Sequence, residues 1–213
     1  MKTFIIFLFV SVLVGSFICT YSAMAKQPSN NDDDDLVRDS DGDPLVARSG
    51  RYIVLAPQGI SLVLSKYPYQ QDCEHTLSQE IMRYERIPCS FHPANASEPF
   101  IRRSKSFNVK FEMPVPQCTN STLWQVSDEI DSVTNFPLIQ IGGVEGNPNC
   151  KTAKNWFKIS KDLNSTYGFV WYPSDVCHGT STSRSLIINE NMSAKPFLCS
   201  DSSLPSQFIF MKG

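Results

Sequence analysis

The sequence lacks the short motifs that mark most catalytic and metal-binding sites. No two cysteines stand in the C-x-x-C spacing typical of structural zinc sites, and the three histidines are scattered along the chain. No serine stands in a G-x-S-x-G elbow, and no glycine-rich run is suited to cradle a phosphate. A cysteine protease would need a free thiolate beside a histidine, whereas these cysteines are expected in disulfides. We therefore predict that the protein is not an enzyme and holds neither a metal nor a cofactor.

An excess of charge of one sign is also missing. The chain has 19 lysines and arginines against 21 aspartates and glutamates, which gives a formal net charge of −2 at pH 7. Proteins that bind nucleic acid through its phosphates need a strongly basic surface. Nucleic acid is therefore not expected as a partner.

Long apolar runs are absent except for one, from Phe4 to Cys19. It follows Lys2 and precedes Ala23-Met24-Ala25, a small-residue tripeptide of the kind at which signal peptidases cut. This pattern predicts a secretory signal peptide over residues 1–25. No comparable run recurs, so no membrane attachment is expected once the signal is removed. The predicted destination is extracellular, with the vacuole as an alternative on the same route.

Six cysteines remain beyond the predicted signal peptide, and an even number in an oxidising compartment predicts three disulfides. Four N-x-S/T sequons agree with this route and predict surface glycosylation. The sequon asparagines are Asn95, Asn120, Asn164 and Asn191.

Residues 26–35 contain four consecutive aspartates and no apolar residue to bury, which predicts a disordered acidic leader. A propeptide or sorting segment is the alternative interpretation. The next three acids, Asp39, Asp41 and Asp43, have the alternating spacing of a calcium loop. Such a loop needs glycine and glutamate where this chain has Pro44 and Gly50, so the calcium hypothesis fails.

From residue 52 onward, the sequence consists mainly of short β-rich runs separated by turn residues. No stretch of a dozen residues shows the spacing of apolar residues that is typical of a helix. The chain is therefore predicted to be all-β. The stretch from Leu77 to Glu85 is the best helical competitor, and we interpret it as strand and loop. The predicted strands are 52–56, 60–65, 85–91, 106–111, 122–127, 137–142, 156–160, 167–172, 185–189 and 207–211.

An internal repeat runs through these strands. Tyr52, Phe107 and Tyr167 each open a strand with an aromatic side chain, at separations of 55 and 60 residues. Three units too small to bury their own apolar faces predict a closed barrel of about twelve strands with threefold pseudo-symmetry. This architecture is a β-trefoil.

The order of several sequence blocks resembles that of the plant Kunitz-type (soybean trypsin inhibitor) family. The blocks are Val37-Arg38-Asp39-Ser40-Asp41-Gly42-Asp43-Pro44-Leu45, Ser106 to Phe111, Cys118 to Val126, Trp156 to Ile159, Tyr167 to Pro173 and Phe208 to Lys212. The resemblance covers residues 36–213 and implies one β-trefoil domain that inhibits proteases. It implies a monomer whose partner is a serine protease, with a cysteine protease as the alternative.

The resemblance also implies a disulfide between Cys73 and Cys118. The family's usual second bridge is in question, because Tyr172 stands where its cysteine is expected. The remaining four cysteines, Cys89, Cys150, Cys177 and Cys199, can pair in three ways. Pseudo-symmetry favours Cys150 with Cys177.

By resemblance, the inhibitory loop falls among His92, Pro93, Ala94, Asn95, Ala96 and Ser97. Its anchor aligns near Asn95, where no arginine or lysine is available for the carboxylate of a trypsin-like specificity pocket. A glycan on Asn95 would also be too bulky for such a pocket. Arg102 and Arg103 are an alternative anchor, or a solvated pair beside a strand. We therefore predict an inhibitor that is not strong against trypsin, with a non-inhibitory binding or storage glycoprotein as the alternative.

Overall fold

A computed structural model describes residues 31–48, 51–66, 73–79, 86–161, 165–179, 183–189, 197–201 and 203–213. Residues Asp32–Gly213 form one compact unit. The predicted signal peptide, residues 26–30 of the predicted leader and the sequons at Asn164 and Asn191 lie outside the described residues. Within the part of the chain that is described, no helix is long and apolar enough to cross a membrane.

The protein is all-β, as predicted, and its strands form one sheet of twelve. All ten predicted strands are present, with shifted ends. Two further strands, β3 and β11, were not among these ten; β3 contains the start of the stretch from Leu77 that was interpreted as strand and loop, and residues 80–85 lie outside the described residues. The strands are β1 (Tyr52–Leu55), β2 (Leu62–Lys66), β3 (Glu74–Gln79), β4 (Cys89–Pro93), β5 (Phe107–Phe111), β6 (Trp124–Ile130), β7 (Pro137–Ile141), β8 (Phe157–Lys161), β9 (Tyr167–Trp171), β10 (Arg184–Asn189), β11 (Phe197–Asp201) and β12 (Ile209–Lys212).

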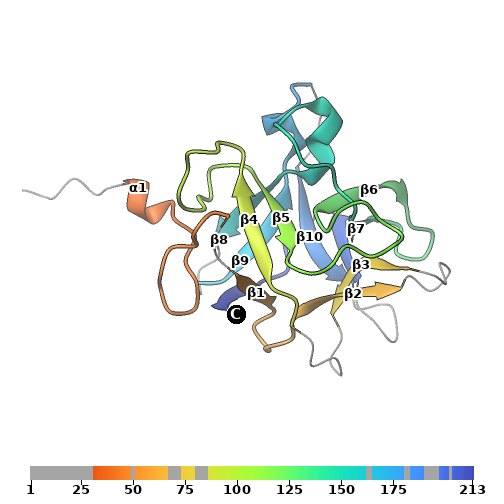
Figure 1. Cartoon of the computed structure of the whole chain (residues 1–213), viewed down its shortest axis with the longest axis horizontal. Helices are drawn as coiled ribbons and strands as arrows, with labels where there is room; N and C mark the ends of the chain where they lie inside the picture. Colours follow the sequence, from red (N-terminus) through yellow and green to blue (C-terminus); the bar gives the residue numbers. More distant parts are fainter. Residues whose placement is uncertain are drawn as a thin grey trace, which may run out of the picture. The chain divides into compact units, whose positions relative to one another are not determined.

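Six of these strands pair in a ring. Strand β1 pairs with β12 on one side and β4 on the other, and the pairing continues through β5 and β8 to β9. From β9, Tyr167 exchanges two backbone hydrogen bonds of 2.7 and 2.8 Å with Phe208, the residue before β12. The pairing thus returns to β12, and Figure 1 shows β4 beside β5 and β8 beside β9.

The predicted threefold repeat is confirmed by register. The three strand-opening aromatics occupy equivalent positions, because Tyr52 pairs with Cys89, Phe107 with Phe157, and Tyr167 with Phe208. Three hairpins, β2–β3, β6–β7 and β10–β11, complete the units, and their second strands all pair with one another. This arrangement is the β-trefoil.

The core of the trefoil is rich in aromatic rings. Phe169 is fully buried, and its ring lies 5.4 Å from that of Trp124, 5.5 Å from Phe208 and 5.9 Å from Phe210. Tilted and edge-on pairs at such separations add to the stabilisation from buried apolar area. The second and third units therefore meet at Phe169.

The opening block ties the amino end of the domain to its carboxyl end. Asp39 is buried and its Oδ1 accepts the backbone N–H of Asp41 and of Asp43, each at 3.0 Å. The turn between them uses Gly42 at φ +87°, a backbone angle that side chains oppose. Lys212 of β12 then pairs with Asp43 at 2.5 Å and Asp39 at 3.3 Å.

Among the described residues, no acidic, histidine or cysteine cluster is suited to hold a metal ion.

The last residues of the predicted acidic leader are structured, which differs from the prediction of disorder. Asn31–Asp34 form one helical turn, α1. Asp35 accepts hydrogen bonds from the backbone N–H and hydroxyl of Ser104, at 2.9 and 2.5 Å, and Asp34 pairs with Arg103. Composition alone missed these contacts because they depend on partners some 70 residues away.

The disulfide prediction is confirmed for two bridges and wrong for Cys89. Cys73 is bonded to Cys118, and Cys150 is bonded to Cys177. Cys89 is free and fully buried. The register explains this, because Cys89 stands in β4 where Phe157 and Phe208 stand in the other units, which places its thiol in the core.

The thiol of Cys89 is expected to be unreactive in the folded protein. Burial, and less so the carboxylate of Glu112, hold its pKa well above its usual range. Thiol reagents attack the thiolate, so reaction should be at least about a hundredfold slower than in denaturant. The rate at which a thiol reagent modifies Cys89, measured in a Cys199→Ser background, checks this. Equal rates with and without denaturant would contradict it.

Candidate inhibitory loop

The predicted loop residues lie at the junction of β4 with the loop that leads to β5. Strands β4 and β5 are antiparallel, and Ala94 N–H donates to the Ser106 carbonyl at 2.9 Å, which closes the base of the loop. His92 and Pro93 belong to β4, so they support the loop. Asn95, Ala96 and Ser97 are exposed, whereas Ala94 and Glu98 are half-buried. Residues 94–98 are called the loop apex below.

The apex is folded by the side chain of Asn95. Its Oδ1 accepts the backbone N–H of Ser97 at 3.1 Å and the Ser97 hydroxyl at 2.8 Å. The Asn95 carbonyl accepts Glu98 N–H at 3.2 Å. An asparagine that bonds the backbone two residues on is a common turn former. The apex is therefore a structured turn although its side chains are exposed.

Arg48 fastens the apex from the other side. The Arg48 guanidinium donates to the carbonyls of Pro93 and Ala96, each at 2.9 Å, and approaches that of Asn95 at 3.5 Å. The Arg48 backbone has φ +64°, and its N–H donates to Phe91 in β4 at 2.9 Å. One side chain with a rigid fork of donors thus spans the apex. No sequence motif pointed to this residue, because the contact bridges about 45 positions.

The descending side of the loop pairs with the opening block. Ala47 N–H donates to the Pro99 carbonyl at 2.8 Å, and Val37 N–H donates to that of Ile101 at 2.9 Å. Ile101 is almost fully buried. These bonds hold the loop to the domain after the apex, so the apex is the free part.

Arg102 and Arg103, the predicted alternative anchor, are engaged in ion pairs. Arg102 lies 3.5 Å from the carboxylate of Glu98, and Arg103 lies 3.3 Å from that of Asp34. Their side chains are only 21% and 27% exposed. Neither residue projects as an anchor must, and both stabilise the descending side of the loop instead.

A polar hollow of about 440 Å³ lies beside the apex. Ser106 at the loop base donates to Asp175 at 2.8 Å, and Lys158 pairs with the same carboxylate at 2.7 Å. On the side that lines this hollow, the apex does not pack closely against the rest of the domain. The lining residues are Pro93, Ala94, Asn95, Glu98, Ser104, Lys105, Ser106, Pro148, Lys158, Asp175 and Val176.

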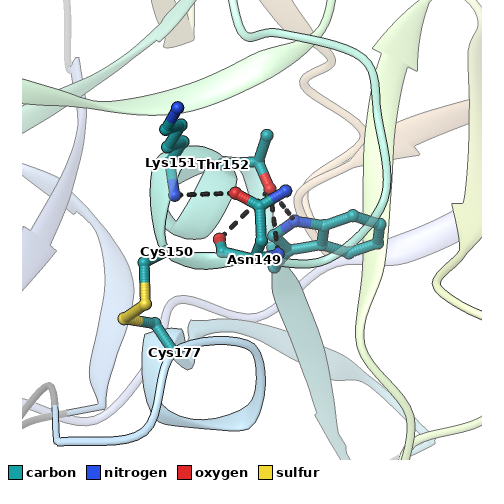
Figure 2. Close-up of a disulfide and its surroundings, with 6 residues drawn as sticks. Asn149, Cys150, Lys151, Thr152 and Cys177 are labelled. Carbon is teal, nitrogen blue, oxygen red and sulfur yellow. Dashed lines mark hydrogen bonds between the residues drawn. A yellow bond between two sulfur atoms is a disulfide. The ribbon is translucent and has the colours of Figure 1, made fainter.

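Two short 3-10 helices lie next to residues that line the hollow, and a disulfide joins their neighbourhoods. Figure 2 shows Cys150 of η1 (Cys150–Asn155) bonded to Cys177, just after η2 (Pro173–Asp175). Asn149 begins η1, because its Oδ1 accepts Lys151 N–H at 2.8 Å. The side chain of Asn108 in β5 donates to the Asn155 carbonyl at 2.7 Å, so η1 is also tied to the strand that follows the loop.

His92 lies in β4, two residues before the start of the apex. Its Nε2 is 2.7 Å from the hydroxyl of Ser90. Burial lowers the pKa of His92, and the cations of Lys110 and Arg48 lower it further against a smaller opposing effect of two glutamates. The imidazole is therefore kept neutral at the foot of the loop.

His92 should make the protein less stable as the pH falls. Below the ordinary pKa of 6.5, His92 binds a proton more readily in the unfolded chain than in the folded protein. The free energy of unfolding therefore falls as the pH falls. We expect a His92→Gln variant to lose less stability than the wild type between pH 7.5 and 5. Denaturant unfolding at both pH values measures this, with His178→Gln, at an exposed position, as control. Identical pH dependence in wild type and His92→Gln would contradict it.

Comparison with known proteins decides the family. The family model described as trypsin and protease inhibitor, of the legume Kunitz type, matches residues 37–212. The chain belongs to this Kunitz family. Its members are inhibitors of proteases and not enzymes, which agrees with the missing catalytic motifs.

Relatives in this family share modest identity with the chain. Miraculin from Synsepalum dulcificum is 35% identical over 91 residues, which cover 42% of this chain and 41% of miraculin. The 21 kDa seed protein of Theobroma cacao is 28% identical over 151 residues, 68% of this chain and 67% of that protein. The match to miraculin thus spans less than half of either protein.

Solved structures agree in fold. A Kunitz-type cysteine protease inhibitor from potato matches with a TM-score of 0.68 and 24% identity, over 83% of this chain and 96% of that one. The Bauhinia bauhinioides kallikrein inhibitor, solved with bovine trypsin, matches with a TM-score of 0.62 and 20% identity, over 84% and 98%. At sequence identities of 20% and 24%, these matches show that the proteins share a fold.

Proposed function

We propose that this Kunitz-family protein is a secreted monomeric inhibitor that presents the loop apex, residues 94–98, to the cleft of a protease. The observation that carries the proposal is the Arg48 guanidinium, which donates to the carbonyl of Ala96 in the apex and to that of Pro93 directly before it, each at 2.9 Å. A loop that is already ordered loses little entropy on binding. With the Asn95 turn inside it and the opening block behind it, the apex meets this requirement.

The expected target is a serine protease, and we do not expect strong inhibition of trypsin-like enzymes. A trypsin-like pocket holds a buried carboxylate and needs a basic anchor. The apex contains no arginine or lysine, Arg48 and Arg102 are occupied by contacts within the loop, and Arg103 pairs with Asp34. A cysteine protease is the alternative partner, since a potato protein of the same fold is described as an inhibitor of that class.

The proposal is tested by titrating the purified protein against pancreatic elastase, chymotrypsin, subtilisin, trypsin and papain. At least one enzyme other than trypsin should be inhibited stoichiometrically. Replacing residues 95–98 by Gly-Ser-Gly-Ser should abolish this inhibition while the unfolding midpoint stays nearly the same. Full activity of all five enzymes at micromolar excess, or inhibition that survives the replacement, would refute the proposal.

A second candidate is a non-inhibitory binding or storage glycoprotein. The observation that favours it is the exposed sequon asparagine Asn95 at the apex, where a glycan would block entry to any cleft. Asn120 is similarly exposed. Mass spectrometry of protein from its natural source decides between the two. Full occupancy of Asn95 favours the second candidate, and an unmodified Asn95 favours inhibition.

A further inference from the structure

An anchor residue in a substrate-like loop must satisfy two conditions. Its side chain must be exposed, so that it can enter the specificity pocket. Its carbonyl must be free of internal hydrogen bonds, because the enzyme's oxyanion hole has to receive that oxygen. Both conditions can be checked for each residue of the apex and for Pro99.

Most of these residues fail. The carbonyls of Asn95 and Ala96 accept Glu98 N–H and the Arg48 guanidinium respectively. The Pro99 carbonyl accepts Ala47 N–H. The remaining exclusions rest on burial, since Ala94 and Glu98 are half-buried and Glu98 also pairs with Arg102.

Ser97 satisfies both conditions. Its side chain is exposed, and its carbonyl accepts no hydrogen bond from any residue that the structure describes. The Ser97–Glu98 peptide is held on both sides, because Ser97 N–H donates to Asn95 Oδ1 and Glu98 N–H donates to the Asn95 carbonyl. The Ser97 hydroxyl is already bonded to Asn95 at 2.8 Å, so it needs no polar partner in a pocket.

We infer that Ser97 is the anchor of this inhibitor and that its targets are serine proteases with a shallow, uncharged specificity pocket of the elastase kind. This inference rests on the proposed inhibition by the apex and names its target class. A small side chain fills a shallow pocket, whereas in a deep pocket with a buried carboxylate it leaves that charge unpaired. The same anchor explains why trypsin should be a poor target.

The test is a change of specificity by one substitution. Wild type should inhibit pancreatic elastase. Ser97→Arg should inhibit trypsin at least about a hundredfold more strongly than wild type does, because it supplies a charge to the pocket carboxylate. The same variant should lose inhibition of elastase by a similar factor.

Matched variants separate the position from other effects. Ala96→Arg places the same charge one residue earlier, at the position whose carbonyl accepts the Arg48 guanidinium, and should not gain trypsin inhibition. Asn95→Gln removes the sequon, as Ser97→Arg also does, and should leave trypsin active. Lys105 is exposed at the loop base, and Lys105→Ala should leave inhibition of elastase unchanged.

The outcomes distinguish this inference from the proposed function. If wild type inhibits another protease through residues 95–98 but Ser97→Arg gains no trypsin inhibition, the assignment of Ser97 is wrong and the inhibitory loop stands. If Ala96→Arg gains and Ser97→Arg does not, the anchor is Ala96. If the wild type inhibits no protease at all and Ser97→Arg gains nothing, the proposed function fails as well.

Discussion

Replacing Phe169 with alanine should lower the free energy of unfolding by about 3–5 kcal/mol. Phe169 is fully buried, and its ring contacts those of Phe107, Trp124, Phe208 and Phe210. Alanine removes the ring where strands of the second and third units meet, and the surrounding β-strands have little freedom to close the cavity. The cost therefore includes both lost burial and the cavity itself.

Chemical denaturation with both disulfides intact measures this change. Phe136→Ala is the matched control, because Phe136 is only half-buried at the β6–β7 turn. We expect the control to lose less than about half as much stability as Phe169→Ala. A loss below about 1 kcal/mol at Phe169 would mean that the core is not centred on this ring.

Replacing Arg48 with alanine should weaken inhibition by about ten- to a hundredfold. Hydrogen bonds from a charged donor contribute about 1.5–3 kcal/mol, and each 1.4 kcal/mol corresponds to a factor of ten. Without the guanidinium, the carbonyls of Pro93 and Ala96 lose their fixed partner and the apex must be ordered on binding. The less ordered loop should also be cut faster by the protease it inhibits.

Two variants control for charge and for general stability. Arg51→Ala removes an exposed arginine three residues away and should leave the inhibition constant unchanged. Arg48→Lys keeps the charge but not the two-pronged donor geometry, so it should restore only part of the inhibition. Inhibition constants and cleavage rates for the three variants check the account. A full effect with Arg51→Ala, or none with Arg48→Ala, would contradict the role of Arg48.

The sequence predicted the architecture well where local pattern and buried position coincide. Tyr52, Phe107 and Tyr167 revealed the repeat because each unit needs an aromatic at the same place in the barrel. Strand β3 was predicted only in part, as the strand and loop from Leu77, because it buries polar Thr76 and Ser78 against other hairpins and so shows no apolar alternation.

The functional details depend on contacts between distant parts of the chain. The family resemblance predicted a position for the inhibitory loop but not the role of Arg48, which reaches the apex across about 45 positions. Likewise, an even cysteine count predicted three bridges. The register of β4 instead encloses Cys89 in the core, at a place where the other units use phenylalanine. Such outcomes follow from tertiary packing, which a single sequence does not display.

If the apex is the part of this protein that a protease engages, the bond at which the protease acts must lie in it, and that bond can be located. The inhibitor is incubated for days with a catalytic amount of an inhibited protease, and the products are sequenced by mass spectrometry. We expect slow cleavage at one bond, between Ser97 and Glu98, with the two fragments held in a folded protein. First cleavage outside residues 94–99, or rapid digestion at many bonds, would contradict it.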